Sequence, residues 1–338
     1  MKKITIDFLG CGEGRFLKKD NNFITNILSK KFEVIIDERN PDYLFCGPSL
    51  YSKKLFKEFK SSKFTNAKVK IYYTGEAISP DFNLFDYSIS PFHKITYSDR
   101  HLHNLFIKTN YWKEVAYNQT QQVDVLEKTS FCNFMYSHQG IKERGIIFDI
   151  LNQYKKVDAI GKYKNNTILN ENSGRHFSSW FEESIDIKKG YKFSIAFEND
   201  LVNGYTTEKI LSSYLANSIP IYLGNPKITT LFNENSFINC HKFKCLEDVV
   251  GYVKEIDLND DMFQKIITAK KPTKNLLELL DKSEEKLEKF LFHIIDQPIK
   301  TAKRIGQGTP NIVYNKFVLR KEMDFKKDKL LNLLKIKR

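Results

Sequence analysis

FSIAFENDLVNGYTTEKILSSYLANSIPIYLGNP is the sequence of residues 193–226, and its pattern decides the fold of this 338-residue chain. The apolar run from Phe193 to Phe197 stops abruptly at two polar residues, and a loop that contains a glycine follows. A helix is predicted to begin at residues 206–209, and it leads into a second apolar run from Ile219 to Leu223. Strand, loop, helix and strand in this order form one crossover unit of a parallel sheet.

Polar side chains collect where the first of these strands ends and the helix begins. Glu198 and Asn199 follow the strand, and Thr206, Thr207 and Lys209 lie at the predicted start of the helix. Parallel sheets bind ligands at the carboxyl ends of their strands, where the N–H groups of a helix start can hold an anion. The segment therefore predicts a site for a phosphate-bearing ligand, which Glu198 would repel unless its side chain points away.

The rest of the chain continues the α/β pattern. Short apolar runs alternate with amphipathic stretches through the first third, as at residues 4–9, 32–36 and 69–73. Residues 110–130 are polar without a clear period and are predicted to form a linker. Apolar residues at helical spacing predict helices over 246–256, 260–271 and 274–295.

Residues 193–226 resemble the signature of glycosyltransferase family 10, the GDP-fucose-dependent α-1,3/1,4-fucosyltransferases, of the bacterial type. The segment departs from the family at Leu223, where many members carry tryptophan, and at Thr206, where many carry valine. Neither position needs to do chemistry. The matching residues are Phe197-Glu198-Asn199, Gly204-Tyr205, Thr207-Glu208-Lys209 and Ile219-Pro220-Ile221-Tyr222, with Gly224 and Pro226.

The resemblance implies a GT-B-like architecture, in which two Rossmann-like α/β domains face one another across a cleft and C-terminal helices follow. We therefore expect an acceptor-side α/β domain with the general base over residues 1–125. A GDP-sugar-binding α/β domain is expected over residues 126–300. A basic tail over residues 301–338 is expected to pack back on the body or to associate with a membrane.

Glu76 is the candidate general base. It lies just past the carboxyl end of the apolar strand 69–73, in the sequence Thr74-Gly75-Glu76. From the residues alone, the alternative is a solvated loop glutamate. The resemblance assigns to Glu76 the removal of the acceptor hydroxyl proton, and an inverting transferase needs only one such carboxylate.

Arg144 and Lys209 are the candidates for stabilising a departing diphosphate. Arg144 begins a predicted helix after the strand 131–136, and its planar guanidinium suits phosphate oxygens. Lys142 competes for this role on the same turn. Lys209 lies in the first turn of a predicted helix, where a cation is mildly unfavourable unless an anion is bound. The resemblance places an arginine that contacts the diphosphate at Arg144.

The donor pocket is assigned by resemblance. Asn199, Tyr205 and Glu208 are expected to line it, and a carboxylate there can accept hydrogen bonds from ribose or sugar hydroxyls. Lys162 and Asn165, in a turn rich in asparagine, are weaker candidates for the same pocket.

Composition and cysteine usage limit the class of protein. Apolar residues make up 41% of the chain, and no apolar stretch approaches the roughly 20 residues that span a bilayer. The N-terminal apolar run is too short for a signal peptide, and five scattered cysteines favour a reducing compartment. We therefore expect a cytoplasmic protein, peripheral at the cytoplasmic face of the membrane if its tail binds there.

No essential metal or other cofactor is expected, and a divalent ion would at most be stimulatory. Two clusters are the alternatives. Cys240, His241 and Cys245 would need further ligands to hold zinc, so they are interpreted as ordinary residues. Asp257 and Asp260-Asp261 are interpreted as a solvated turn and a helix cap.

The formal charge of +13 is concentrated at the C-terminal end. Residues 300–338 contain 12 basic and 3 acidic residues, a net charge of +9, whereas the first 299 residues carry +4. Leucines at helical spacing among lysines after Met323 indicate a basic amphipathic helix on a membrane surface. A terminal helix packed on the body is the alternative.

The leading hypothesis is an inverting transferase that moves L-fucose from GDP-fucose to a hydroxyl of an N-acetylglucosamine- or glucose-containing glycan. An α-1,3 linkage and a role in surface polysaccharide or lipopolysaccharide synthesis are expected. The alternative enzyme keeps the GDP-sugar pocket and takes another deoxyhexose or a heptose. The alternatives from other classes are a nucleic-acid-binding protein that uses the basic tail and a non-catalytic glycan-binding relative. No nucleic-acid partner is expected, because the sequence of the body reveals no basic face.

Acceptor specificity is expected to reside in loops of the first domain around residues 81–97. His93, His101 and His103 resemble a metal cluster only by spacing, because no strand is evident that would align them. They are interpreted as loop or core histidines.

Overall fold

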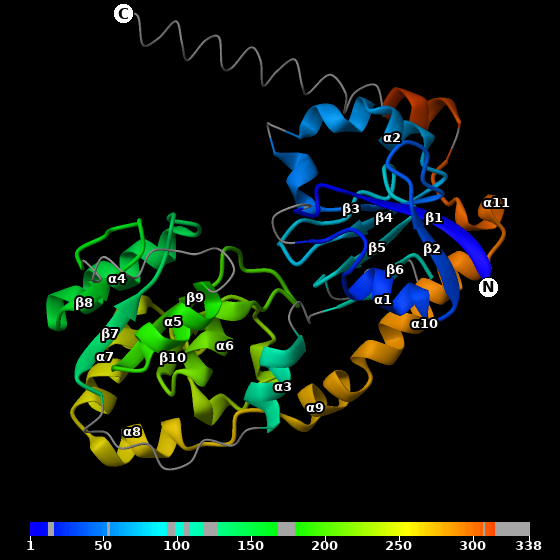
Figure 1. Ribbon diagram of the computed structural model, residues 1–338. Helices are drawn as coiled ribbons and strands as arrows, with labels where there is room; N and C mark the ends of the chain where they lie inside the picture. Colours follow the sequence, from blue (N-terminus) through cyan, green and yellow to red (C-terminus); the bar gives the residue numbers. More distant parts are fainter. Residues whose placement is uncertain are drawn as a thin grey trace, which may run out of the picture. The chain divides into compact units, whose positions relative to one another are not determined.

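The chain folds into two compact α/β units (Figure 1). Unit 1 comprises residues 1–104 and 284–338, and unit 2 comprises residues 105–283. Each unit has one parallel sheet with helices, which confirms the predicted α/β class and its two Rossmann-like sheets. The boundaries differ from those expected at residues 125 and 300. The computed structural model describes residues 1–12, 17–52, 55–92, 99–104, 109–117, 128–167, 180–306 and 308–314.

Unit 1 is built on a six-stranded parallel sheet. Its strands are β1 (Lys2–Leu9), β2 (Phe32–Ile36), β3 (Tyr43–Cys46), β4 (Val69–Tyr73), β5 (Tyr87–Ser90) and β6 (His101–His103). They lie in the order β2-β1-β3-β4-β5-β6. The first four follow the predicted apolar runs. The sequence did not reveal β5 and β6, because serines and histidines interrupt their apolar pattern.

Alternate residues of the unit 1 strands face two different apolar layers, as the two-residue period of a strand requires. Tyr43 and Phe45 pack in a core with α1 (Phe23–Ser29) and α10 (Ser283–Asp296). Leu44 and Cys46 pack in a second core with residues of η1 (Pro48–Tyr51), η2 (Phe56–Lys60) and α2 (Ser62–Asn66).

The single helix predicted over residues 274–295 is wrong, because the chain breaks at Lys282. There α9 (Lys274–Asp281) ends, and α10 begins at the next residue. Leu280 of α9 is buried in a core of unit 2, whereas Leu287 of α10 is buried in a core of unit 1. The two helices therefore serve different cores, which a continuous spacing of leucines does not reveal.

The segment that follows α10 and α11 (Ile299–Ala302) is bound to unit 1. The fully buried carboxylate of Asp86 accepts hydrogen bonds from the N–H groups of Arg304 and Ile305, at 2.6 and 2.8 Å. The hydroxyl of Tyr314 donates to Asp81. The beginning of the basic tail thus packs back on the body, and residues 315–338 lie outside the described part of the chain. Across the described residues, no helix combines the length and apolar character needed to cross a bilayer.

Unit 2 is built on a five-stranded parallel sheet. Its strands are β7 (Ser130–Phe134), β8 (Val157–Ala159), β9 (Tyr191–Phe197), β10 (Ile219–Leu223) and β11 (Ile238–Asn239). They lie in the order β11-β10-β9-β7-β8. The chain runs from β7 to β8 on one side and continues through β9 on the other. The neighbours β7 and β9 therefore flank a topological switch point.

Two helical layers cover this sheet. Phe193 and Ile195 of β9 pack with apolar residues of α4 (Lys142–Tyr154), α7 (Leu246–Asp257) and α8 (Asp260–Ile267). Ala196 of β9 and Tyr222 of β10 pack with α3 (Thr109–Tyr117), α5 (Trp180–Lys188), α6 (Glu208–Leu215) and α9. The predicted crossover unit of residues 193–226 is thus the strand β9, the helix α6 and the strand β10.

The linker predicted over residues 110–130 is wrong in its first part. The helix α3 occupies residues 109–117, and Trp112, Val115 and Ala116 are buried in a core of unit 2. Their spacing is helical, but charged residues between them hide it in a short segment. Residues 118–127 lie outside the described part of the chain.

Candidate functional site

Five of the residues singled out in the sequence meet at the switch point between β7 and β9. Arg144 lies in the first turn of α4, which follows β7, and Glu198 and Asn199 follow β9 directly. Glu208 and Lys209 begin α6. Open parallel sheets bind their ligands at such points. We call these five residues the switch-point cluster.

Arg144 links the start of α4 to the end of β9. Its Nη2 donates hydrogen bonds to the carbonyl oxygens of Phe197 and Glu198, both at 2.8 Å, and to Oδ1 of Asn199 at 3.0 Å. Its Nη1 donates to the carbonyl oxygen of His138 at 3.2 Å. The guanidinium therefore fixes the backbone at the end of β9 and orients Asn199.

The charge of Arg144 is buried among uncharged acceptors. The side chain is fully buried, and its Nε has no hydrogen-bond partner among the described residues. The guanidinium carbon lies 3.9 Å from the ring centre of Tyr136. Burial raises the pKa of Tyr136 to about 12, although the charges of Arg144 and Lys209 act in the opposite direction. A buried cation with an unused donor is a favourable place for an anion.

Lys209 lies between two carboxylates. Its Nζ is 3.2 Å from Oε2 of Glu198 and 3.2 Å from Oε1 of Glu208, and it donates to Oγ1 of Thr207 at 2.9 Å. The side chain of Glu198 is fully buried, whereas that of Glu208 is 35% exposed and that of Lys209 is 14% exposed. The side chain of Lys209 is therefore mostly buried between the two carboxylates.

These contacts set the protonation of the cluster. Burial lowers the pKa of Lys209, but the charges of Glu208 and Glu198 outweigh it and hold the pKa well above its usual value. Burial raises the pKa of Glu198, and the charge of Lys209 opposes this. For Glu208, burial is outweighed by the charge of Lys209 and by hydrogen bonds, so its pKa is lowered. Lys209 is therefore a cation and Glu208 an anion at neutral pH.

The start of α6 is occupied by a side chain of the protein itself. Oε1 of Glu198 accepts a hydrogen bond from the N–H of Thr207 at 2.8 Å, and Oε2 accepts one from the Thr207 hydroxyl at 2.6 Å. The Glu198 side chain thus occupies the start of α6, where the backbone was expected to hold a phosphate, and points toward Lys209. The N–H of Thr207 at this helix start is therefore already bound to a protein carboxylate.

Gly224 makes room for this arrangement. A Cβ atom at Gly224 would collide with the side chain of Glu198 and would lie 2.6 Å from the hydroxyl of Tyr222. The glycine after β10 is therefore required by the close approach of Glu198. Its neighbour Asn225 is buried and contacts the loop before α6, and no feature of the sequence pattern singled it out.

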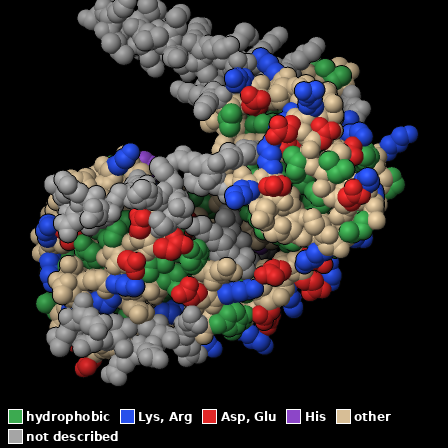
Figure 2. Space-filling model, viewed as in Figure 1, with side chains coloured by type: hydrophobic (Ala, Val, Ile, Leu, Met, Phe, Trp, Pro, Cys, Tyr) green, Lys and Arg blue, Asp and Glu red, His purple; other side chains and the backbone are tan. Residues whose placement is uncertain are grey.

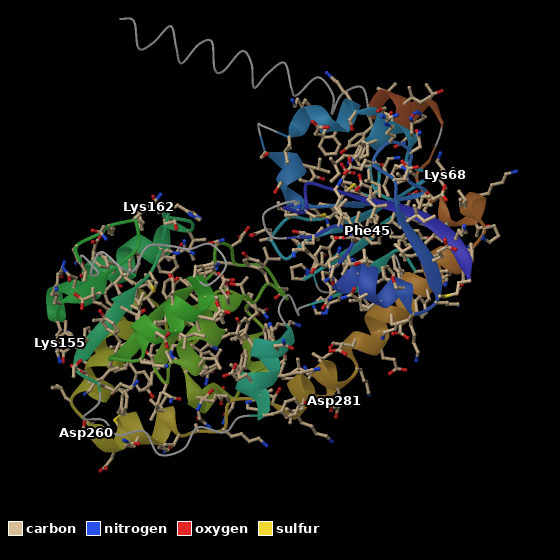
Figure 3. All side chains as sticks on the ribbon, in the orientation of Figure 1. Phe45, Lys68, Lys155, Lys162, Asp260 and Asp281 are labelled. Atoms are coloured by element: carbon tan, nitrogen blue, oxygen red, sulfur yellow. The ribbon has the colours of Figure 1, made fainter. Side chains whose placement is uncertain are left out.

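The remaining unit 2 candidates lie in different surroundings. Tyr205 is 1% exposed, and its phenol is close enough to raise the pKa of Lys209. Nδ2 of Asn165 donates to carbonyl oxygens of its own turn, including that of Gly161 at 3.0 Å, so it closes the loop after β8. Lys162 is exposed on this loop, at the opposite end of unit 2 from Asp260 (Figure 3).

Glu76 lies in unit 1, on the turn that follows β4. Its N–H donates to the buried hydroxyl of Thr74 at 2.9 Å, and its carbonyl oxygen accepts from the N–H of Ile78 at 2.8 Å. The residue is exposed. Glu76 thus lies on a turn at the carboxyl edge of the unit 1 sheet.

The histidines of unit 1 are explained by β6. His101 Nδ1 lies 2.6 Å from the hydroxyl of Ser88, and Nε2 lies 3.0 Å from the carbonyl oxygen of Phe92. Burial lowers the pKa of His101. The expectation that no strand contains His101 and His103 is wrong, and His101 is an internal hydrogen-bonded residue. His93 lies outside the described residues.

The residues of the two metal alternatives lie in different surroundings. Cys240 is buried whereas Cys245 is exposed, and Nε2 of His241 lies 3.1 Å from the carbonyl oxygen of Gly224. Asp257 is not solvated as expected: it is buried and pairs with Lys155 at 3.1 Å. Within the described ranges, no three His, Cys, Asp or Glu residues are grouped so that they could hold a metal ion.

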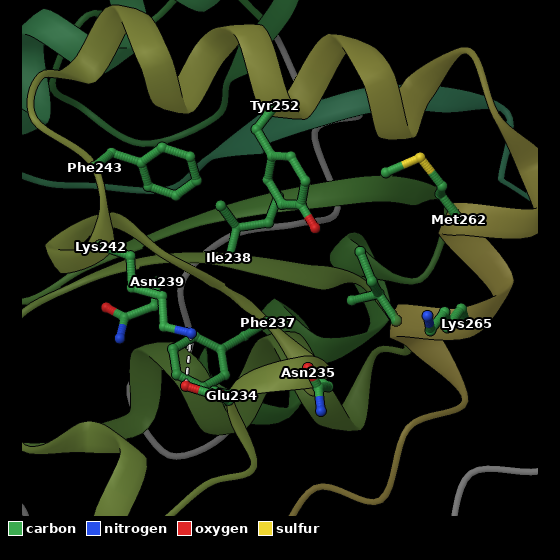
Figure 4. Close-up of a pocket in the computed structure, with 11 residues that line it drawn as sticks. Glu234, Asn235, Phe237, Ile238, Asn239, Lys242, Phe243, Tyr252, Met262 and Lys265 are labelled. Atoms are coloured by element: carbon green, nitrogen blue, oxygen red, sulfur yellow. Dashed lines mark ion pairs between the residues drawn. The ribbon is translucent and has the colours of Figure 1, made fainter.

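Unit 2 also contains a cavity of about 290 Å³ beside the edge strand β11 (Figure 4). The rings of Phe243 and Tyr252 and the ion pair between Lys242 and Glu234, at 2.6 Å, line it. None of the predicted site residues contributes to this lining. The cavity is therefore separate from the switch-point cluster.

Two family models match the sequence. The model of the C-terminal part of glycosyltransferase family 10 (fucosyltransferase) matches residues 125–291. The model of the alpha-(1,3)-fucosyltransferase FucT N-terminal domain matches residues 6–108. Together, these matches take up most of the chain.

Individual relatives share parts of the sequence. The alpha-(1,3)-fucosyltransferase FucT of Helicobacter pylori is 28% identical over 75% of this chain and 56% of its own length. The GDP-fucose protein O-fucosyltransferase 3 of Xenopus tropicalis is 29% identical over 35% of this chain and 25% of its own length. This chain thus spans little more than half of the first relative and a quarter of the second.

The fold is shared with a solved enzyme. The crystal structure of an alpha1,3-fucosyltransferase with GDP-fucose superposes with a TM-score of 0.64 and 23% sequence identity, over 86% of this chain and 91% of that one. The predicted resemblance is confirmed by both family models and by this fold. The chain belongs to glycosyltransferase family 10, the fucosyltransferases.

Proposed function

We propose that the protein is an inverting α-1,3-fucosyltransferase that moves L-fucose from GDP-fucose to a hydroxyl of an N-acetylglucosamine- or glucose-containing glycan. The observation that carries the proposal is the switch-point cluster. Within a family 10 segment, it presents a buried guanidinium with an unused donor and an ammonium group held at the edge of the site. Two fixed cations suit a diphosphate.

In the proposed mechanism, Glu76 accepts the proton of the acceptor hydroxyl. The hydroxyl oxygen then forms a bond to the anomeric carbon of fucose as the bond from that carbon to the diphosphate breaks. The bonding electrons leave with GDP, and the charges of Arg144 and Lys209 stabilise them. Because one displacement occurs, the configuration at the anomeric carbon inverts.

The donor pocket is proposed to include Asn199, Tyr205 and Glu208. The ionised carboxylate of Glu208 can accept hydrogen bonds from hydroxyls and can stabilise positive charge on the sugar ring. Lys162 and Asn165 are weaker members of this pocket. Asn165 is the weaker of the two, because its amide already donates to the carbonyl oxygens of its own turn.

One experiment tests donor, acceptor and stereochemistry together. The protein is incubated with GDP-fucose, GDP-mannose, a GDP-heptose and UDP-galactose against a glycan array, and the linkage of each product is determined. We expect transfer from GDP-fucose with α-1,3 linkage. Transfer from the heptose donor alone would establish the alternative enzyme, and the absence of transfer from every donor would favour a non-catalytic glycan-binding protein.

No metal ion is required in this mechanism, because protein cations take the role that a metal has in other transferases. We therefore expect activity to persist in excess chelator. Loss of activity that returns with a divalent ion would contradict this.

A cytoplasmic location, synthesis of surface polysaccharide or lipopolysaccharide, and peripheral membrane contact through the tail are further parts of the proposal. A chain that stops after Arg320 keeps Arg304 and Tyr314, which bind the body, and removes the lysine-rich end. Its co-sedimentation with anionic vesicles should fall relative to the full chain. Equal co-sedimentation would end the membrane proposal.

The nucleic-acid alternative receives little support from the surface. On the face drawn in Figure 2, acidic and basic side chains are interspersed over the described residues of both units. Nucleic-acid-binding proteins instead concentrate basic residues on one face. Tight, salt-dependent binding to duplex DNA would nevertheless revive this class.

A further inference from the structure

Asn225 connects the end of β10 to the loop that precedes α6. Its residue exposure is 2%, so its amide is removed from water. Oδ1 accepts a hydrogen bond from the N–H of Gly204 at 3.1 Å, and Nδ2 donates to Oγ1 of Thr206 at 3.1 Å. One amide thus binds the loop on both sides of Tyr205.

Asn225 is itself held from the strand side. Its N–H donates to the hydroxyl of Tyr222 at 3.0 Å, and its Oδ1 also accepts from the N–H of Lys227 at 3.0 Å. Because Tyr222 belongs to β10, the amide is anchored to the rigid sheet. The loop residues Gly204 and Thr206 therefore take their positions from the sheet and not from solvent contacts.

The fixed loop leads directly into the switch-point cluster. Thr207 follows Thr206, and its N–H and hydroxyl bind the carboxylate of Glu198. Lys209 in turn contacts Thr207 and Glu198. A displacement of Thr206 would therefore be passed through one peptide bond to the groups that orient Lys209.

We propose that Asn225 and Thr206 form a clamp that positions the loop 204–207 for donor binding, so that the nucleotide diphosphate meets a site already arranged. The clamp makes Asn225 a positioning residue, because its hydrogen bonds reach the cluster only through the loop. It also gives Thr206 a role as the acceptor of the Asn225 amide. The inference rests on the proposed GDP-sugar function of the cluster.

The test measures GDP affinity by calorimetry and donor KM in four variants. In Thr206→Val, the shape of the side chain is kept, and the hydroxyl that contacts the Asn225 amide and the Tyr222 hydroxyl is lost. We expect GDP binding to weaken about fivefold, within the range for the loss of one or two neutral hydrogen bonds. Thr206→Ser keeps the hydroxyl and should bind GDP as the wild type does. Asn225→Ala loses both loop contacts and should weaken binding about tenfold or more.

The double variant Thr206→Val with Asn225→Ala should lose less GDP affinity than the two single losses combined, since both changes remove the contact between Asn225 and Thr206. Donor KM should rise in step with the GDP dissociation constant, while acceptor KM stays unchanged. Additive losses in the double variant would show that Thr206 and Asn225 act separately, which would overturn the clamp.

Asn133→Ala is the matched control. Asn133 is a fully buried asparagine of the same unit, and its amide donates to Ser194 at 2.7 Å inside the sheet. This variant should lose stability without losing GDP affinity. If Thr206→Val and Asn225→Ala also keep wild-type GDP affinity, they only support the fold and the inference is wrong. If the wild type does not bind GDP at all, the proposed function fails together with the clamp.

Discussion

The switch-point cluster of unit 2 and the turn that carries Glu76 in unit 1 are built in opposite ways. In unit 2, Arg144 and Glu198 are fully buried and every charged group is fixed by several contacts. In unit 1, the backbone of Glu76 is fixed by Thr74, but its carboxylate lies on an exposed residue. The two settings differ in burial, because the charges of Arg144 and Glu198 are enclosed by protein, whereas Glu76 is an exposed residue on a turn.

The largest effect on turnover is expected from substitution of the exposed residue Glu76. Glu76→Gln should lower kcat by about 10²–10⁴-fold, because the amide cannot accept the acceptor proton. GDP affinity should stay the same, since Glu76 belongs to the other unit. Glu33→Gln, at an exposed glutamate of the same unit, is the control and should be fully active. Near-normal turnover of the Glu76 variant would remove this residue from the mechanism.

Substitution of Lys209 tests the buried switch-point cluster of unit 2. Lys209→Met leaves the buried carboxylate of Glu198 without its cation, so the free energy of unfolding should fall by about 3–5 kcal/mol. Adding Glu198→Gln should restore most of this stability. GDP affinity should be lost in both proteins. Urea unfolding and calorimetry separate the two effects, and retained GDP binding in the doubly substituted protein would contradict the role of Lys209.

A third substitution tests the attachment of the C-terminal segment to the rest of unit 1. Asp86→Ala removes the acceptor for the N–H groups of Arg304, Ile305 and Lys70, and the free energy of unfolding should fall by about 3 kcal/mol. GDP affinity should not change, because these contacts lie entirely within unit 1. A matched chain that stops after Pro298 should be destabilised to a similar extent. Unchanged stability of both proteins would show that the C-terminal segment is not part of the fold.

The smallest effect is expected behind the cluster, at Lys188. Its Nζ lies 2.5 Å from the hydroxyl of Ser212 on α6, and burial lowers its pKa from 10.5 to about 8. Glu208 raises and Lys209 lowers this pKa, but burial is the largest cause. Below pH 8 both the folded and the unfolded chain carry the proton on Lys188. The free-energy cost of burying this charged group therefore does not change with pH in that range. Between pH 8 and 10.5 the unfolded chain binds more protons, and stability should rise with pH.

Lys188→Met should therefore increase the free energy of unfolding at pH 7 by about 1–2 kcal/mol and reduce its rise above pH 8. Lys271, whose pKa is also lowered to about 8 by burial, titrates in both proteins, so their difference isolates Lys188. Urea unfolding of both proteins at pH 7 and pH 9.5 measures the difference in their free energies of unfolding. A less stable variant at pH 7 would show that the Ser212 contact outweighs the burial of the charge.

The sequence was most informative where one segment contains strand, loop, helix and strand in succession. Residues 193–226 predicted β9, α6 and β10 as well as the polar edge between them. The direction of Glu198 could not be predicted, because it depends on Gly224 and Lys209 meeting it in space. The buried surroundings of Arg144 likewise depend on the end of β9, because its partners Phe197 and Asn199 are 53 and 55 residues away in the sequence. The local sequence pattern thus predicted where the polar edge lies. Contacts between residues distant in the sequence determine which groups each charged side chain meets.

Errors at the unit boundary have a similar cause. Helical spacing is the same whether a helix packs on one core or on two, so the break between α9 and α10 was not visible. The short strand β6 was missed because two of its three residues are histidines. Helix α3 was missed because charged residues separate Trp112 from Val115. In each case tertiary contacts, and not local preference, fix the element.

The central claim is that the cations of the switch-point cluster bind the diphosphate of a GDP-sugar. The most direct measurement is a calorimetric titration of the wild-type protein with GDP, guanosine and UDP under identical conditions. The account predicts that GDP binds at least about 100-fold more tightly than guanosine, because two charge-assisted contacts are lost without the phosphates. UDP should bind more weakly than GDP. Guanosine that binds as tightly as GDP would contradict the account.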